Sequence, residues 1–413
     1  MLSSKLIIAG SGTARSLSCK QVRTICHKSK LKAEKVYRWP YETRSYTRLT
    51  SLLDPRTKNK FNDNTKIIQV EGNVAAGKEE FARKLADELG MVYFPQVDLE
   101  NLYINRSGYD YRALNPLLPE RLRACDMEMF HENPTRHSVI HMQYNLFKMR
   151  LFQFFKVLQH IFNTGQGVVL TRSVFTERVF VEAMHELGWL PMGYLRGDGV
   201  RFYDWKVRYL YTRNLVLTSV PRPHLTVYLD TPVDTCLERI KNDPNPTVAN
   251  SKALSREFLE GIENAYKNVV LPKQDFNGLV LNVDHPEHKT HDEIMDVVDD
   301  IEKLDFTYDH HDSRFEEWNP FFAFWHHDFR RLYTSDRVLK FADKLIQPYY
   351  DIAGMGDSIT DGDIKLKRAL IENHVRPFWK HEFDADRYGY ISSYFGFLNL
   401  GQYMDKSMRC DYW

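Results

Sequence analysis

The stretch that decides the fold runs from residue 66 to residue 78 and consists of Lys66-Ile67-Ile68-Gln69-Val70-Glu71-Gly72-Asn73-Val74-Ala75-Ala76-Gly77-Lys78. Its first half is a short apolar run that ends at a glycine, which is typical of a buried strand. Its second half has the spacing Gly-x4-Gly-Lys. A helical pattern follows at once, with Phe81, Leu85 and Leu89 at intervals of four residues. Strand, glycine-rich loop and helix in this order form the layout of a phosphate-binding loop.

The backbone of such a loop wraps a phosphate group, because its glycines allow successive N–H groups to point inward at the start of a helix. The predicted nucleotide-binding residues of the loop are Gly72, Asn73, Ala75, Ala76, Gly77 and Lys78. The next position departs from the pattern, because a working loop has a serine or threonine there to hold magnesium and this chain has Glu79. The loop therefore predicts either a nucleotide site damaged for phosphoryl transfer or a fold element without a ligand. A chance match to the spacing is a third interpretation.

Four further apolar runs have the length of buried strands, and a long helix lies between two of them. The runs cover residues 92–95, 168–170, 225–229 and 279–283. The helix is predicted over residues 138–162 from an apolar stripe at helical spacing. Short apolar strands separated by helices predict an α/β fold with a parallel sheet covered by helices on both faces. Ligands of such sheets bind at the carboxyl ends of the strands.

The first 33 residues differ in charge from the rest of the chain. Residues 1–33 contain seven lysines and arginines and no acidic residue. Basic residues interspersed with serines are typical of a mitochondrial presequence. We therefore predict a presequence over residues 1–33, cleaved near residues 23–29, and a linker over residues 34–63. A disordered basic tail is the alternative.

Composition excludes several classes of protein. The 380 residues after the basic segment carry 49 basic and 55 acidic side chains, a net charge of −6, which argues against nucleic acid as the main partner. Five cysteines without a Cys-x-x-Cys pair argue against a disulfide framework. No run of about 18 apolar residues is present, so no transmembrane segment is predicted.

Aromatic residues are concentrated at the C-terminal end. The segment from Phe306 to Trp413 contains 24 of the 55 aromatic residues of the chain. We predict an aromatic-rich, mainly helical C-terminal extension over residues 301–413. Because buried aromatic side chains dominate both cores and interfaces, two interpretations remain open. The extension is either a subdomain packed on the chain's own sheet or a surface that docks on another protein.

The loop and the segments that follow it resemble the deoxynucleoside kinase family over roughly residues 64–290. The resemblance implies a P-loop kinase-like domain over residues 64–300. The chain also resembles the branch of this family whose members are accessory subunits of mitochondrial respiratory complex I. That resemblance implies other subunits of complex I as partners, and a peripheral location on the matrix side of the mitochondrial inner membrane.

Several positions with a catalytic role in the family are changed here. The resemblance places Gln96 where the family has the glutamate that acts as general base, and an amide cannot accept that proton. It places Thr171 where the family has a magnesium-binding glutamate, while the phosphate-facing Arg172 remains. Arg239 remains at the start of the arginine-rich lid. The later lid arginines are absent, and Pro244 and Pro246 are expected to break the helix that would carry them.

The nucleoside end of the family's site is better preserved. Gln143, one helical turn before Phe147, is placed to pair with a base edge through its donor and acceptor. Glu177 matches an acidic residue that completes base recognition through an arginine. Phe130 replaces a tyrosine that contacts the sugar. The alternatives are a helix-end amide in water or bonded to the backbone for Gln143, and an ordinary surface acid for Glu177.

We therefore predict a non-catalytic accessory subunit of complex I, with no catalytic residue and no metal site. No cofactor is required, and a bound (deoxy)nucleotide is the one ligand that the resemblance suggests. The first alternative is an active mitochondrial deoxynucleoside kinase in which Glu79 holds magnesium and Asp98 or Glu100 is the base. The second is a soluble nucleotide sensor.

Overall fold

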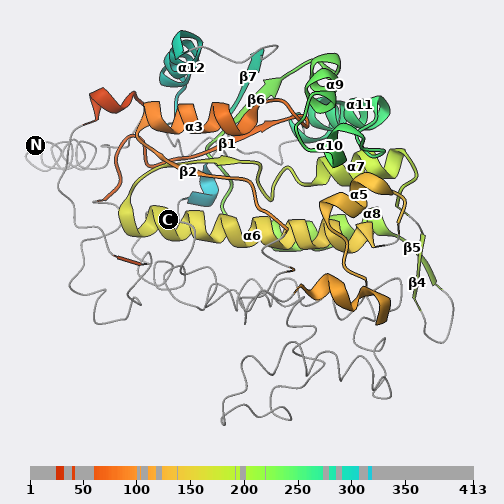
Figure 1. Ribbon diagram of the computed structural model, residues 1–413. Coiled ribbons are helices and arrows are strands. Elements are labelled where there is room, and N and C mark those ends of the chain that lie inside the picture. Colours follow the sequence, from red (N-terminus) through yellow and green to blue (C-terminus); the bar gives the residue numbers. More distant parts are fainter. Residues whose placement is uncertain are drawn as a thin grey trace, which may run out of the picture.

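The computed structural model describes residues 25–31, 40–41, 60–99, 103, 110–117, 123–136, 138–190, 192–195, 201–218, 220–272, 279–284, 291–306 and 315–318. At its centre is a five-stranded parallel sheet with the strand order β2-β3-β1-β6-β7 (Figure 1). The strands are β1 (Ile67–Gly72), β2 (Val92–Phe94), β3 (Val168–Thr171), β6 (Leu225–Asp230) and β7 (Leu279–Asp284). All five strands were predicted from their apolar runs, and the predicted α/β class is confirmed.

Helices cover both faces of the sheet. Helices α3 (Lys78–Leu89) and α12 (His291–Lys303) lie on one face, and the long helix α6 (Val139–Thr164) lies on the other (Figure 1). The other α-helices are α5 (Met127–Glu132), α7 (Arg178–Glu186), α8 (Trp205–Leu217), α9 (Val233–Lys241), α10 (Pro246–Ala249) and α11 (Arg256–Asn264).

The described chain also contains helical turns of other types. They are η1 (Lys28–Lys30), η3 (Tyr111–Leu117), the π-helical η5 (Ala265–Val270) and η6 (Glu316–Trp318). The antiparallel hairpin of β4 (Met192–Leu195) and β5 (Arg201–Asp204) was not predicted. Among the described residues no helix is long and apolar enough to cross a membrane.

Helix α3 begins and ends where the sequence predicts. Gly77 before its first residue and Gly90 after its last both have a left-handed backbone, which glycine adopts without a steric penalty. Helix α6 differs from the prediction, because it is buried on both its apolar and its polar side. Its far side is covered by chain outside the sheet. The Tyr41 hydroxyl lies 2.9 Å from His160 Nδ1, and Lys60 Nζ donates to the carbonyl of Asn163.

Part of the predicted presequence packs on the sheet domain. Ile25 is fully buried. The backbone of Cys26 exchanges hydrogen bonds of 2.8 and 2.6 Å with the side chain of Asn64. The backbone N–H of His27 donates to Glu302 Oε1 at 2.7 Å, and its Nε2 lies 3.0 Å from Glu88 Oε2. Residues 25–31 thereby join the last turns of α3 and α12. Residues 1–24 and most of the predicted linker lie outside the described residues.

These contacts make a prediction about processing. We expect the mature chain to begin at or before Ile25, because cleavage further on would remove the buried side chain and the paired backbone of Cys26. N-terminal sequencing of the chain purified from mitochondria checks this. A mature chain that starts after Ile25 would contradict it.

The start of the C-terminal extension is anchored at the amino-terminal edge of the sheet. Trp318 Nε1 donates to the carbonyl of Arg222 at 2.8 Å, and Glu317 accepts from the backbone N–H of Arg222 at 2.9 Å. The ring of His224 lies 4.3 Å from that of Trp318 and 5.6 Å from that of Phe315, measured between centroids. This anchor agrees with packing of the extension on the chain's own domain. The rest of the extension, residues 319–413, lies outside the described residues.

The buried His224 predicts a pH dependence of stability. Burial first, and then the nearby Lys66, hold the pKa of His224 well below its usual value, and its Nδ1 accepts from the backbone N–H of Ile67 at 3.1 Å. The unfolded chain therefore takes up a proton below about pH 6.5 that the folded chain does not, so stability falls as the pH falls, by up to about 1.4 kcal/mol per pH unit. His131, whose pKa is also lowered by burial, acts in the same direction.

The substitution His224→Asn keeps the acceptor but removes the titration. We expect it to reduce the loss of unfolding free energy between pH 7 and pH 5 while leaving the contribution of His131. Urea unfolding at several pH values measures this slope. An unchanged slope would show that His224 is not a neutral, buried histidine.

Candidate nucleotide site

The loop between β1 and α3 has the backbone of a phosphate cradle. Gly72 has a φ of 152°, and a Cβ there would lie 2.9 Å from the carbonyl oxygen of Leu229 on β6. Gly77 has a φ of 79°. Ala75 has a φ of 58°, which costs a non-glycine residue about 1–2 kcal/mol. The loop therefore holds a strained conformation at a position where the sequence offers no glycine.

The side chains of the loop bond to the loop itself and to its neighbours. Lys78 is buried, and its Nζ donates to the carbonyl of Asn73. Burial first, and then Arg172, lower its pKa well below the usual value. Arg239 on α9 donates from Nη1 to the carbonyl of Ala75 at 3.2 Å, and Asn73 Nδ2 donates to the carbonyl of Leu259 at 3.0 Å. The structure thus brings the predicted Lys78 and Arg239 to the same loop.

The predicted Arg172 lies in a tight turn directly after β3. It has a φ of 60°, its backbone N–H donates to the carbonyl of Val70 at 3.1 Å, and its guanidinium stacks 4.4 Å from the ring centre of Phe180. The turn is held by Glu71, which accepts from the backbone N–H of Ser173 at 3.0 Å. Arg172 therefore follows the strand next to β1, and its charge is close enough to lower the pKa of Lys78 in the loop.

Sequence reasoning missed the role of Glu71. Its carboxylate is fully buried and accepts from the hydroxyl of Thr176 at 2.6 Å and from that of Tyr266 at 2.9 Å. Burial raises the pKa of Glu71, while hydrogen bonds and the nearby arginines oppose that rise. The sequence did place Glu71 at the end of a predicted buried strand. A carboxylate buried there needs hydrogen-bond partners, and this could have indicated its role.

Gln143 and Glu177 are both buried, so the alternatives of a solvated amide and a surface acid are excluded. Glu177 forms a buried ion pair with Arg150, which lies seven residues, or about two turns, after Gln143 on α6. Burial, followed by the charge of Arg172, lowers the pKa of Arg150 to about 10. Gln143 Oε1 is buried without a hydrogen-bond partner among the described residues. Sequence reasoning missed Arg150, although the interval of seven from Gln143 could have indicated it.

Phe130 is part of an aromatic cluster beside the site. Its ring centre lies 6.2 Å from those of Trp189 and Phe258, in edge-on contacts. No hydroxyl is present here to contact a sugar, as the sequence indicated. The cluster forms an apolar wall between α5, α7 and α11.

The positions where the resemblance places changed catalytic groups differ in their exposure. Glu79 and Gln96 are exposed, and so is Asp98. Thr171 lies 3.2 Å from the hydroxyl of Tyr93. Glu100 lies outside the described residues. Helix α9 ends at Lys241 and α10 begins at Pro246, which confirms the predicted break of the lid helix.

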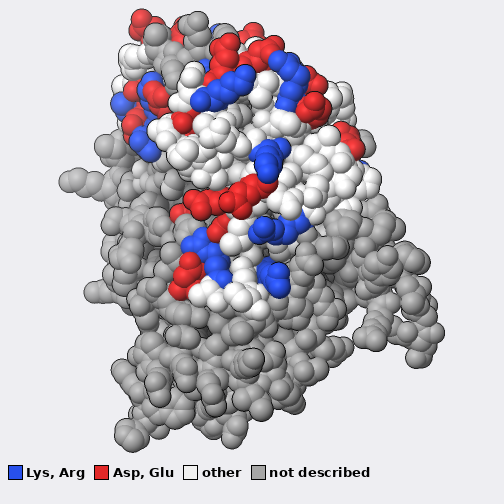
Figure 2. Space-filling model, turned by 45° about the vertical axis from the view of Figure 1, so that its right-hand side comes forward, with Lys and Arg blue, Asp and Glu red and all other residues white. Residues whose placement is uncertain are grey.

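Basic side chains outnumber acidic ones among the buried groups near the loop. Lys78, Arg150 and Arg172 are buried, as are the carboxyl groups of Glu71 and Glu177. An excess of basic groups at the start of a helix suits a phosphate group. On the described part of the surface in Figure 2, blue and red groups are interspersed. The described residues contain no group of three or more side chains arranged to hold a metal ion.

Comparison with known proteins agrees with this geometry. The family model described as deoxynucleoside kinase matches residues 68–304, and the chain belongs to the deoxynucleoside kinase family. It is 32% identical over 263 residues to NADH dehydrogenase (ubiquinone) 1 alpha subcomplex subunit 10, mitochondrial, of Mus musculus, covering 63% of this chain and 68% of that protein. It is 28% identical over 228 residues to deoxyguanosine kinase of Dictyostelium discoideum, covering 55% of this chain and 67% of that protein. A solved structure of deoxyadenosine kinase from M. mycoides with bound dATP covers 57% of this chain and 98% of its own, with 18% identity and a TM-score of 0.40.

The buried ion pair predicts a large cost for neutralising one partner. We expect Glu177→Gln to destabilise the chain by about 3 kcal/mol, because it leaves the charge of Arg150 buried without its counter-ion. Glu186→Gln, at the exposed last residue of α7, is the control and should change stability by less than about 0.5 kcal/mol. Urea unfolding of both variants measures the difference, and equal effects would contradict the pairing.

Proposed function

We propose that this chain is a non-catalytic accessory subunit of mitochondrial NADH dehydrogenase, respiratory complex I. In this proposal it lies on the matrix side of the inner membrane, bound to other subunits, and its kinase-like domain supports assembly and stability. The observation that carries the proposal is the combination of an intact family fold with altered catalytic positions. The similarity to an NADH dehydrogenase subunit supports complex I as the assembly to which the chain belongs.

The altered positions argue against phosphoryl transfer by their magnitudes. A general base contributes about 10²–10⁴-fold, and Gln96 cannot serve as one. Loss of a phosphate-stabilising arginine costs about 10³–10⁵-fold in related chemistry, and the chain beyond α9 lacks the later lid arginines. Lys78 is engaged with the carbonyl of Asn73 in its own loop. Even with partial overlap between these effects, little turnover is expected to survive.

The surroundings of the phosphate loop retain features that suit a bound nucleotide. The excess of buried basic side chains near the loop favours a phosphate group. Gln143 Oε1, which is buried without a hydrogen-bond partner among the described residues, offers an acceptor toward a base. The strained backbone at Ala75 is maintained although the chemistry is lost. We therefore propose that a (deoxy)nucleotide is held as a structural ligand, without magnesium-dependent turnover.

An active kinase is the second candidate, because the chain also resembles a deoxyguanosine kinase. In that case Glu79 would hold magnesium, and Asp98 or Glu100 would act as the base. Both described side chains, those of Glu79 and Asp98, are exposed.

One preparation of the native chain distinguishes these candidates. Supplied with ATP, magnesium and each deoxynucleoside in turn, it should form no monophosphate above the background of Lys78→Ala. Acid extraction of the same preparation should release about one nucleotide per chain. Product formation that depends on Lys78 would establish the kinase, and extraction without nucleotide would overturn the structural ligand.

A further inference from the structure

The segment between α9 and α11, residues 242–255, spans the space from the phosphate loop to helix α5. We call it the lid segment. At one end, Arg239 of α9 donates to the carbonyl of Ala75 in the loop, and at the other end Asn73 of the loop donates to the carbonyl of Leu259 on α11. Its flanking helices are therefore both tied to the phosphate loop.

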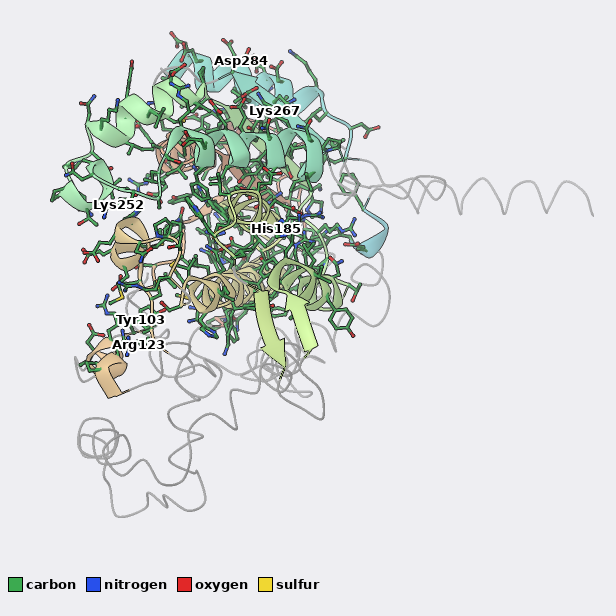
Figure 3. All side chains as sticks on the ribbon, turned by 90° about the vertical axis from the view of Figure 1, so that its right-hand side faces the viewer. Tyr103, Arg123, His185, Lys252, Lys267 and Asp284 are labelled. Atoms are coloured by element: carbon green, nitrogen blue, oxygen red, sulfur yellow. The ribbon has the colours of Figure 1, made fainter. Side chains whose placement is uncertain are left out.

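The middle of the lid segment is tied to α5 on the opposite side. His131 on α5 is buried, and its Nδ1 lies 2.8 Å from the hydroxyl of Ser251. The carbonyl of His131 accepts from the backbone N–H of Lys252 at 2.9 Å. Figure 3 shows Lys252 beside this helix, and α5 and α10 are in contact. The following residues Ala253 and Leu254 are buried.

The direction of the bond between His131 and Ser251 follows from the other partners of the hydroxyl. Ser251 Oγ already accepts from the backbone N–H groups of Ala253 at 3.2 Å and Leu254 at 3.1 Å. Its own proton is therefore free to donate, and His131 Nδ1 is the acceptor within reach. Burial lowers the pKa of His131, which agrees with a neutral ring that accepts at Nδ1.

We propose that His131 and Ser251 form a latch that holds the lid segment closed between the phosphate loop and α5, so that a bound nucleotide exchanges slowly. This inference rests on the proposed retention of a nucleotide and adds what retains it. A kinase must open its lid in every turnover, whereas a structural ligand needs a lid that stays closed. The closed position is favoured by the hydrogen bonds of His131 to Ser251 and Lys252 and by the burial of Ala253 and Leu254.

The test uses the full-length chain, saturated with N-methylanthraniloyl-ATP and then chased with excess ATP. Ser251→Ala and His131→Phe each remove the bond between the His131 ring and the Ser251 hydroxyl, and His131→Phe keeps an aromatic ring and the backbone bond to Lys252. Ser251→Ala also removes the acceptor of the Ala253 and Leu254 N–H groups. Since a hydrogen bond of this kind is worth about a factor of ten, His131→Phe should release the probe roughly tenfold faster than wild type and Ser251→Ala at least tenfold faster. The double variant should be no faster than Ser251→Ala, because His131→Phe removes no bond that Ser251→Ala has left.

Thr247→Ala is the matched control, because it removes a hydroxyl from the same segment outside the latch. It should release the probe at the wild-type rate. Equal release from wild type, Ser251→Ala and His131→Phe would overturn the latch while leaving nucleotide retention in place. Multiplied effects in the double variant would also overturn it. If wild type binds no probe and its acid extract contains no nucleotide, both the retention and the latch are wrong.

A second measurement reports the latch without a probe. Amide hydrogen exchange at Lys252, Ala253 and Leu254 should be slow in wild type and Thr247→Ala, and about tenfold faster in Ser251→Ala and His131→Phe, where the rest of the chain keeps its protection. Exchange that is equally fast at these three amides in wild type would contradict a closed lid segment.

Discussion

The buried carboxylate of Glu71 is the interaction on which the rest of the site depends. It lies at the end of the central strand β1, directly before the phosphate loop, and it binds the turn after β3 through Ser173 and Thr176. Its second oxygen binds Tyr266 in the π-helical turn after α11. A charge this deeply buried is tolerated only with partners, so the carboxylate fixes three segments to one another. The turn that holds Arg172 next to β1 follows from that constraint.

The phosphate loop and the attachments of the additional segments lie at opposite edges of the sheet. The phosphate loop and the Arg172 turn lie at the carboxyl ends of the strands. The segments outside the kinase-like core attach at the opposite edge, where Asn64 binds residues near Cys26 and His224 packs against Trp318. Changes in catalytic residues at one edge therefore leave the attachments at the other edge intact. This arrangement agrees with the proposal of a kinase fold that keeps a structural role without its chemistry.

The sequence allowed the sheet, the loop and the capped helix α3 to be predicted, because each depends on a local pattern of apolar residues and glycines. It also indicated the break after α9 from its prolines. It did not reveal the pair of Arg150 with Glu177, the partners of Glu71, or the contact of His131 with Ser251. Each of these joins residues from separate elements, more than 25 positions apart in sequence. These contacts depend on how the helices pack on the sheet. A periodic pattern within one segment does not specify that packing.

The most direct test of the account is the native size of this chain in mild-detergent extracts of mitochondria. Native gel separation followed by detection of the chain with an antibody is sufficient. The account predicts that the chain migrates with the in-gel NADH dehydrogenase activity of complex I and that little of it migrates free. A band at one or two chain masses, separate from that activity, would contradict the central claim.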